Sequence, residues 1–184
     1  NVNCFGNNTG SISFLATGGT PDYDVELDGI LQGNIPTSGG TLTISSLTAG
    51  TYILEIIDNN GCAANYNTSL SQPPQLTLTK LATDADCFGT STGSVNISVN
   101  GGVPNYTFSW NNGSSNEDLV GVVAGAYTVL VTDANNCTAS TSATVNEPAA
   151  LALSTSSTPA SCNPDGSASV SVTGGTAPYA YTWS

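Results

Sequence analysis

Short runs in which apolar and polar residues alternate recur along the chain, with Gly, Asn and Pro between them. In SVNISV the apolar positions are Val95, Ile97 and Val99, and GAYTVLVTD repeats this spacing from Tyr127 to Val131. A period of two places such side chains on one face of a β-strand. Because strand signals return about every 8 to 12 residues and no helical stripe of useful length is present, the pattern predicts an all-β sandwich with about seven strands in each unit.

The chain contains internal repeats, which define its organisation. CFGNNTGSISFLATGGTPDY, from Cys4, matches CFGTSTGSVNISVNGGVPNY, from Cys87, and CNPDGSASVSVTGGTAPY, from Cys162, matches both with two residues fewer. LTAGTYILEIIDNNGC, which ends at Cys62, matches VVAGAYTVLVTDANNC, which ends at Cys137. One unit is therefore about 75 residues long.

A unit begins at a Pro-led strand, PQLTLTKL or PAALALST. This phase predicts a first unit that lacks its first strand (1–73), a complete unit (74–147) and the N-terminal half of a third (148–184). The first unit also carries eight additional residues between Leu27 and Tyr52. Since a half unit alone would leave a sheet edge and half a core exposed, we expect these residues to belong to a longer array of units, stacked end to end into a rod.

Charge and missing residue types exclude several classes of function. The 184 residues include 13 Asp and Glu, one Lys and no His, with a formal net charge of -12, and there is no Arg. Without His or Arg there is no Ser-His-Asp or Cys-His pair and no guanidinium clamp for phosphate. One lysine cannot displace the counterions of DNA or RNA, so nucleic acid is excluded as a partner. The longest apolar run, near 52–57, is far below the roughly 20 residues that membrane insertion needs.

Charged residues make up 8% of the chain, and Ser, Thr, Asn and Gly carry its polarity, which is typical of extracellular β-proteins. The motifs GGVPNYTFSW, GGTAPYAYTWS, AGTYILEIIDNNGC and AGAYTVLVTDANNC resemble the SprB repeat family, found in giant surface adhesins of gliding bacteria. The AGxYxVxV segment is more distantly similar to the polycystic-kidney-disease (PKD) type, immunoglobulin-like sandwich. The resemblance spans nearly the whole chain. It implies tandem immunoglobulin-like modules in a secreted cell-surface fibre of a bacterium, often exported by the type IX secretion route.

Aromatic residues alternate along the strand that follows the Gly-Gly pair in the second and third units. Alternation places the rings on one face, which a sandwich needs for its core, whereas a sugar-stacking platform would need rings that face water. The first unit has Tyr23, Val25 and Leu27 in these places, and so a smaller core there. The predicted core aromatics are Tyr106, Phe108, Trp110, Tyr127, Tyr179, Tyr181 and Trp183.

Five cysteines in an extracellular context predict disulfides. One arrangement pairs them within units, Cys4 with Cys62 and Cys87 with Cys137. In an immunoglobulin-like unit, however, these positions lie at opposite poles, about 23 Å apart, whereas a disulfide tolerates a Cα separation of about 7 Å. We therefore favour a bond between successive units, Cys4 with Cys137, over intra-unit pairs and free thiols. Cys62, Cys87 and Cys162 would then have partners in neighbouring repeats outside these residues.

Carboxylates gather in PDYDVELDG, where those from Asp22 to Asp28 alternate with apolar residues and are expected on the exposed face of one strand. Calcium takes six to eight oxygen ligands, usually from a loop with DxDxDG-like spacing, and the sequence has no such loop. We therefore interpret these residues as a solvated acidic face and predict no cofactor. Stabilisation by Ca2+ is the alternative, for which the candidates are Asp22, Asp24, Asp84, Asp86 and Asp133.

These features predict a structural or adhesive segment of a large secreted surface fibre, used in attachment or gliding motility. Its expected partners are neighbouring repeats of the same chain, surface polysaccharide or other copies in a fibre. The alternative is a carbohydrate-binding or spacer module of a secreted polysaccharide-degrading enzyme, which tandem repetition disfavours. Catalysis within these residues is not expected, because carboxylates such as Asp22 and Asp24 share one strand face instead of flanking a cleft.

Overall fold

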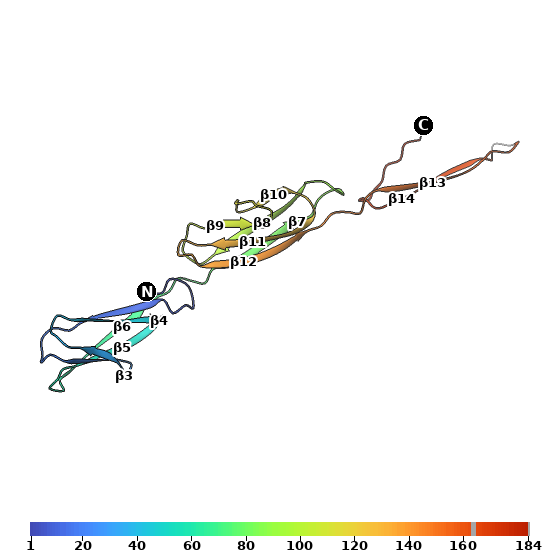
Figure 1. The fold of residues 1–184 in the computed structure, drawn as a ribbon. Coiled ribbons are helices and arrows are strands. Elements are labelled where there is room, and N and C mark those ends of the chain that lie inside the picture. Colours follow the sequence, from blue (N-terminus) through green and yellow to red (C-terminus); the bar gives the residue numbers. More distant parts are fainter. Residues whose placement is uncertain (163–164, 184) are drawn as a thin grey trace. The chain divides into compact units, whose positions relative to one another are not determined.

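The computed structural model of the protein describes residues 1–162 and 165–183. Every regular element in this part is a β-strand (Figure 1), so the predicted all-β class is confirmed. Within the same residues, no helix is long and apolar enough to cross a membrane. The strands are β1 (Gly10–Leu15), β2 (Tyr23–Leu27), β3 (Ile30–Ile35), β4 (Thr41–Leu47), β5 (Gly50–Ile57), β6 (Ala63–Leu70), β7 (Thr77–Thr83), β8 (Gly93–Asn100), β9 (Thr107–Trp110), β10 (Leu119–Val122), β11 (Gly125–Thr132), β12 (Thr138–Val145), β13 (Ala152–Thr158) and β14 (Ser167–Thr173).

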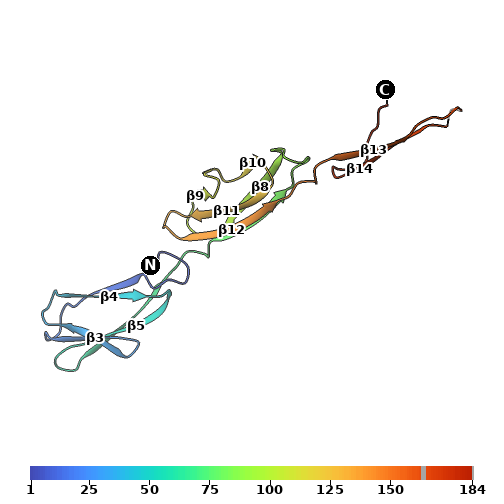
Figure 2. The same ribbon diagram turned by 45° about the vertical axis from the view of Figure 1, so that its right-hand side comes forward.

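The strands of the first repeat form two sheets that pack face to face. A two-stranded sheet of β1 and β4 covers a four-stranded sheet in the order β3-β2-β5-β6. Figure 2 shows β4 on one side of this sandwich and β3 and β5 on the other. Alternation along β2 directs Tyr23, Val25 and Leu27 into the core, where they join the cluster that includes Phe14 and Ile44 from the other sheet. This arrangement is an immunoglobulin-like sandwich.

The insertion of the first repeat includes an additional strand, β3. β2 turns into β3 through Asp28 and Gly29, whose φ angles of 50° and 79° are those of a two-residue hairpin turn. The prediction that four carboxylates line one strand face is therefore wrong at both ends. Asp22, with φ 83°, precedes β2, and Asp28 accepts a hydrogen bond from the Ile53 N–H at 2.8 Å. Only Asp24 and Glu26 lie in β2.

The second repeat is a sandwich of two three-stranded sheets, β10-β8-β7 and β12-β11-β9. Its fully buried side chains come from the positions that alternation predicts, for example Val129 in β11 at 0% exposure. Of the predicted core aromatics, Trp110 and Tyr127 are buried, while Tyr106 and Phe108 are half-buried. The alternating pattern therefore identified this core correctly.

The second repeat has six strands, not the seven that we estimated. Residues 111–118, NNGSSNED, form local turns instead of a strand. The Trp110 N–H donates to the Ser114 carbonyl, and the Gly113 N–H donates to the Trp110 carbonyl, both at 3.0 Å. Asn, Gly and Ser favour such local hydrogen bonds over a sheet ladder.

Tyrosine hydroxyls make the same hydrogen bonds in successive repeats. The hydroxyls of Tyr52 in β5 and Tyr127 in β11 donate to the carbonyls of Thr48 and Val123, which precede these strands, both at 2.8 Å, as in the tyrosine corner of immunoglobulin-like folds. A second type occurs at the Gly-Gly pairs that precede β2, β9 and the YAYTW segment, where the tyrosine five residues after the first glycine donates to that glycine's carbonyl. These bonds run from Tyr23 to Gly18, from Tyr106 to Gly101 and from Tyr179 to Gly174.

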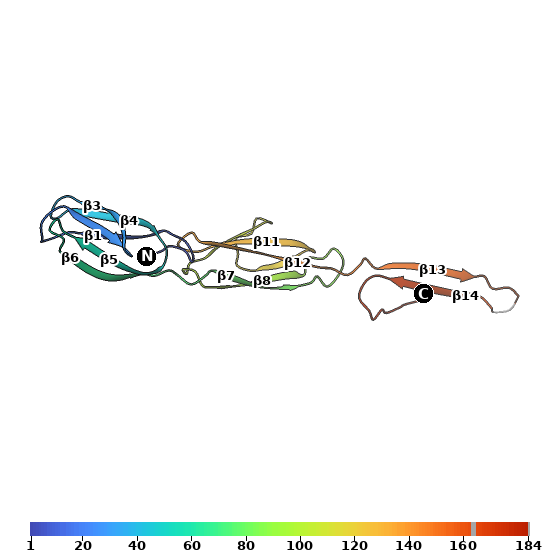
Figure 3. The ribbon, with the colours of Figure 1, turned by 90° about the horizontal axis from the view of Figure 1, so that it is seen from below.

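The third repeat is represented by the β13-β14 hairpin (Figure 3). The prediction that its aromatics form a core is wrong for this structure, because Tyr179, Tyr181 and Trp183 are 37%, 53% and 62% exposed. In the second repeat, the equivalent strand β9 forms one sheet with β11 and β12, and this sheet packs against the one that contains β7, β8 and β10. The described residues hold no counterpart of β11 and β12 for the third repeat.

The structure divides into two compact units that do not follow the repeat boundaries. The first contains Asn1–Thr77 together with Asn100–Tyr106 and Thr132–Thr138, two turn regions of the second repeat. The second contains the remaining strands. The turn that carries Cys137 therefore belongs to the same compact unit as the first repeat.

Candidate functional site: a disulfide between repeats

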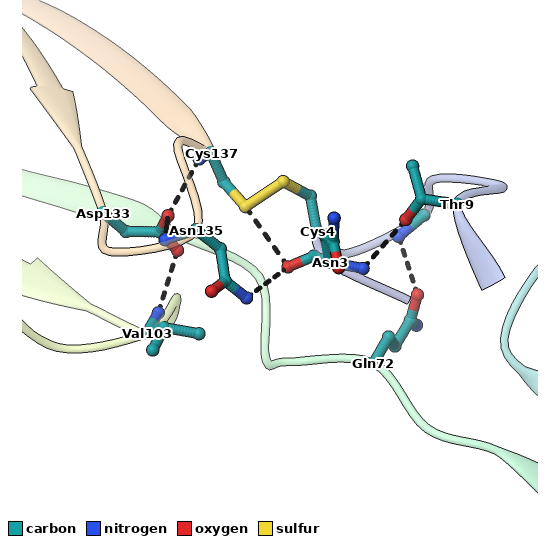
Figure 4. Close-up of a disulfide and its surroundings, with 9 residues drawn as sticks. Asn3, Cys4, Thr9, Gln72, Val103, Asp133, Asn135 and Cys137 are labelled. Atoms are coloured by element: carbon teal, nitrogen blue, oxygen red, sulfur yellow. Dashed lines mark hydrogen bonds between the residues drawn. A yellow bond between two sulfur atoms is a disulfide. The ribbon is translucent and has the colours of Figure 1, made fainter. Parts of the chain in front are cut away.

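Cys4 and Cys137 form a disulfide, with an S–S distance of 2.01 Å and a Cα–Cα distance of 5.7 Å (Figure 4). The two cysteines are 133 positions apart and come from the first and second sequence repeats. This is the pairing that topology favoured over an intra-repeat bond. Cys62, Cys87 and Cys162 are exposed free thiols.

Cys137 is held in place by a turn built around the carboxylate of Asp133. Its Oδ1 accepts hydrogen bonds from the N–H groups of Asn135 at 2.9 Å and Cys137 at 2.8 Å, and its Oδ2 accepts one from Val103 at 2.9 Å. Figure 4 shows the carboxylate between these groups. Asn136 has φ 63°, which Asn tolerates better than most residues. The turn thus presents the sulfur of Cys137 on a fixed backbone.

Cys4 lies in a turn whose backbone is held by two side chains. The Asn3 N–H donates to Thr9 Oγ1 at 2.9 Å, and the Gly6 N–H donates to Gln72 Oε1 at 2.7 Å. The Asn3 carbonyl accepts a further bond from Nδ2 of Asn135, at 2.8 Å. The disulfide is therefore accompanied by a direct hydrogen bond between the two turns that carry its cysteines.

Asp133 is the one buried charged residue among the described residues, at 4% exposure. Burial by itself raises the pKa of its carboxyl, but the N–H groups of Val103, Cys137 and Asn135 outweigh burial, so the pKa lies below its ordinary value of 3.8. The ionised form therefore stabilises the fold at pH above about 4. That contribution is lost as the pH falls through the lowered pKa.

We expect Asp133→Asn to lower the free energy of unfolding by about 1–3 kcal/mol at pH 7, because an amide nitrogen would face the Val103 N–H and leave a buried donor unsatisfied. The loss should shrink as the pH falls from about 4 through the lowered pKa of Asp133, because the wild-type carboxylate then becomes protonated. Urea titrations between pH 2.5 and 7 measure both effects. The exposed Glu117 provides the control, since Glu117→Gln should change stability by less than about 0.5 kcal/mol. A wild-type-like Asp133→Asn would contradict the assigned role.

The Cys137 half of the site has a close counterpart in the first repeat. Asp58, four residues before Cys62, accepts hydrogen bonds from the N–H groups of Thr20 at 3.0 Å, Asn60 at 3.0 Å and Cys62 at 2.8 Å. Bonds from the Thr20 and Cys62 backbone lower the pKa of Asp58 as well. Cys62 is thus a preformed but unpaired equivalent of Cys137.

The Cys4 half also has a counterpart, in the second repeat. The N–H of Asp86 donates to Thr92 Oγ1 at 2.8 Å, and the N–H of Gly89 donates to Glu147 Oε2 at 2.6 Å. These bonds reproduce those that hold the turn of Cys4. The roles of these supporting residues were missed from the sequence, although Asp and Asn recur four and two residues before both Cys62 and Cys137.

The candidate calcium ligands do not come together. Within residues 1–162 and 165–183, no group of three or more His, Cys, Asp or Glu side chains could hold a metal ion. The carboxylate of Asp133 is already engaged by backbone N–H groups, and Oδ1 of Asp84 accepts hydrogen bonds from the N–H and Nδ2 of Asn146. Asp22 and Asp24 are exposed on the first repeat, and Asp86 is exposed on the second.

The fold and this disulfide define an all-β repeat protein of immunoglobulin-like sandwiches with a covalent link between successive repeats. The SprB repeat model matches residues 1–29, 79–115 and 154–184, which together make up just over half of the chain. The protein therefore belongs to the SprB repeat family, as its motifs indicated. Proteins of this family are extracellular and lie on the cell surface, and a disulfide is consistent with that location. Repeats of this kind are typically non-catalytic.

The solved structures to which this chain is similar include three with TM-scores of 0.30 to 0.39. An amphioxus IgVJ-C2 molecule has 15% sequence identity and a TM-score of 0.33, and the match covers 76% of this chain and 97% of that one. A C-terminal 282-residue fragment of intimin, in complex with the intimin-binding domain of its translocated receptor, has 16% identity and a TM-score of 0.39, with 80% of this chain and 55% of that one covered. Fibronectin(III)-like modules of Clostridium thermocellum CbhA have 14% identity and a TM-score of 0.30, with 74% of this chain and 84% of that one covered. The chain thus spans about half of the intimin fragment. A search of curated proteins finds no match.

Proposed function

We propose that this chain is a non-catalytic structural segment of a large secreted cell-surface fibre, which serves in attachment or gliding motility. Membership of the SprB repeat family supports this proposal. The observation that carries it is the disulfide between Cys4 and Cys137, because a covalent bond from one repeat to the next strengthens a protein that is built from tandem repeats. Repetition extends reach, and nearest-neighbour links set stability in such arrays.

In this proposal the same bond recurs along the parent chain and the repeats stack end to end into a rod. Cys62 would pair with a preceding repeat, and Cys87 and Cys162 with following ones. The matching hydrogen bonds around Cys62 and Cys137, and around Cys87 and Cys4, support this recurrence. Each bond would restrict movement at one link and so stiffen the fibre.

The proposed partners are neighbouring repeats, other copies in a fibre and surface polysaccharide. The exposed faces of the strands are rich in Ser, Thr and Asn, as in β6 and β12, and such rows support weak polar contacts with sugars. Weak contacts repeated along one fibre add up through avidity. Export by the type IX route is part of the same proposal.

The proposal is tested by locating the protein on intact cells. Antibodies raised against residues 1–184 should label unpermeabilised cells, and electron microscopy should place the label along thin unbranched fibres. Brief protease treatment of the cells should remove the label and surface attachment together, while an antibody against a cytosolic protein labels only permeabilised cells. Label on compact particles that degrade polysaccharide would instead favour a spacer module of an enzyme, and label that needs permeabilisation would refute a surface role.

A further inference from the structure

A small cavity lies beside the disulfide between Cys4 and Cys137. It has a volume of about 340 Å³, and both cysteines contribute to its lining. The other lining residues are Phe5, Asn7, Gln75, Leu76, Asn136 and Thr138. All of these residues belong to the first compact unit. Sites for small ligands commonly have volumes of about 300–1,000 Å³, so this cavity has the size of a small ligand site.

The walls of the cavity are held in place by covalent and hydrogen bonds. The disulfide joins the turn of Cys4 to the turn of Cys137, and Nδ2 of Asn135 donates to the Asn3 carbonyl at 2.8 Å (Figure 4). The carboxylate of Asp133 fixes the backbone of Cys137. A ligand would therefore enter a preformed site and order few protein groups, which favours binding.

The lining of the cavity is polar but uncharged. Among the described residues, none that lines it carries a charge. The chain has a net charge of -12, which repels anionic ligands, and the lining offers no carboxylate to a cation. The polar groups are instead the side-chain amides of Asn7, Gln75 and Asn136 and the hydroxyl of Thr138. Such a lining fits a neutral ligand that carries many polar groups.

The three amides are available to a ligand. All three residues are exposed, and within the part of the chain that the structure describes their side chains make no hydrogen bond. Each amide can donate through its nitrogen and accept through its oxygen. Each hydroxyl of a sugar also donates and accepts, so neighbouring hydroxyls can satisfy both atoms of an amide. The amides therefore favour a sugar among neutral ligands.

Phe5 adds an aromatic ring that faces water, at 50% exposure. One face of a sugar ring carries C–H groups, which pack well against an aromatic face. The aromatic residues of the second core, Trp110 and Tyr127, are buried and cannot make this contact. Phe5 can, because it lines the cavity together with the amides.

The exposed phenylalanine recurs in the second repeat. Phe88 follows Cys87 as Phe5 follows Cys4, and it is 59% exposed. The second repeat includes its Pro-led strand β7, for which the first repeat has no counterpart among the described residues, so the exposure does not come from a missing strand. The second repeat, which follows Phe5, also has both of its sheets. The exposed ring is thus a property of the repeat itself.

We propose that this cavity, defined by Phe5, Asn7, Gln75 and Asn136, binds a neutral sugar residue of a polysaccharide. The ring of Phe5 stacks on one face of the sugar, and the amides exchange hydrogen bonds with its hydroxyls. Because Phe5 and Asn136 come from successive repeats, the site exists only where the two repeats are joined. The inference rests on the proposed function, since it gives the expected contact with surface polysaccharide a definite site, and sites repeated along a fibre would add avidity.

The first test measures binding of neutral trisaccharides of glucose, galactose and mannose, each labelled with a fluorophore at its reducing end. The protein is the 184-residue chain in which Cys62, Cys87 and Cys162 are replaced by serine, so that copies cannot cross-link. At least one neutral probe should bind with a dissociation constant on the order of 1 mM. A trisaccharide of galacturonic acid should bind at least about tenfold more weakly, because the chain repels anions. Absence of binding by all three neutral probes would overturn the proposal.

The second test replaces the aromatic ring. Phe5→Ala should weaken binding of the neutral probe at least about tenfold, because the stacking surface is lost. Tyr181→Ala is the matched control, since Tyr181 is 53% exposed against 50% for Phe5 and lies outside the cavity. Circular dichroism and peptide mapping without reduction confirm that both variants fold and keep the bond between Cys4 and Cys137. Weaker binding in Tyr181→Ala but not in Phe5→Ala would place the sugar elsewhere and refute the site.

The third test addresses the amides. Gln75→Ala should weaken binding about threefold or more, through the loss of one hydrogen bond. Alanine fits there, because Ala150 occupies the equivalent position of the third repeat. Gln32→Ala, on the exposed part of β3, is the control and should bind like the parent. In NMR spectra, the sugar should shift the side-chain amide signals of Asn7, Gln75 and Asn136. Equal binding by the two glutamine variants, or shifts confined to other residues, would contradict the proposal.

The sugar site and the proposed function fail in different experiments. Binding is measured on the purified chain, so its absence would remove the sugar site and leave the surface fibre untouched. Antibody label that needs permeabilised cells would refute the surface role, whereas binding that depends on Phe5 would still establish the site.

Discussion

Replacement of Trp110 by alanine is expected to lower the free energy of unfolding of the second repeat by about 3–5 kcal/mol. Trp110 is 4% exposed, and its Nε1–H donates to the Asn116 carbonyl at 2.8 Å. The substitution removes the largest side chain of this core and leaves a cavity. Since a domain of about 75 residues has a stability of roughly 4–11 kcal/mol, most of the repeat's stability would be lost. Urea unfolding followed by circular dichroism measures the change.

Two further variants separate packing from hydrogen bonding at this position. Trp110→Phe keeps much of the ring volume but removes the indole N–H, so we expect a smaller loss of about 1–2 kcal/mol. Val120→Ala, on the exposed face of β10, should change stability by less than about 0.5 kcal/mol. A Trp110→Ala variant as stable as Val120→Ala would mean that Trp110 is not a core residue.

Removal of the disulfide by the double substitution Cys4→Ser and Cys137→Ser is expected to lower the free energy of unfolding by about 2–5 kcal/mol. The bond closes a loop between positions 133 apart, so its loss restores much conformational freedom to the unfolded chain. Urea unfolding without reductant measures the effect. Cys62→Ser is the control, because Cys62 is exposed and unpaired, and we expect it to change stability by less than about 0.5 kcal/mol.

Peptide mapping without reduction checks the pairing itself. In the 184-residue chain, Cys4 should be linked to Cys137, and a link from Cys4 to Cys62 would contradict the structure. In the natural protein, the same mapping should find peptides with Cys62 and Cys87 linked to other repeats. If they are free thiols there, the recurrent bond is wrong, while the bond between Cys4 and Cys137 stands.

Local patterns were sufficient to predict much of the fold because they report on a single strand at a time. Alternation identified Val95, Ile97, Tyr127 and Val129 as core residues, and these are buried. It was less reliable where a local turn competes with a strand. Asp28 matches the alternation of β2, but Asp-Gly forms a hairpin turn there, which makes β3 a separate strand.

The candidate site combined predictable and unpredictable parts. Cys4 and Cys137 could be paired from topology, since the poles of a sandwich are too far apart for an intra-repeat bond. The hydrogen bonds that support the two cysteines could not be predicted from the sequence. Asp133 is of a residue type that binds calcium, and only the structure reveals that its carboxylate oxygens accept hydrogen bonds from the backbone of its own turn and of Val103.

The sequence by itself determined the repeat length, the all-β class, the faces of the core strands and the family, because these depend on spacing along one chain. Tertiary structure decided the rest. Whether the tyrosine and tryptophan of YAYTW are buried depends on whether their segment joins further strands in a sheet that packs against the opposite one, and here Tyr181 and Trp183 are exposed. Such properties belong to neighbours in space, so no pattern within a single strand can specify them.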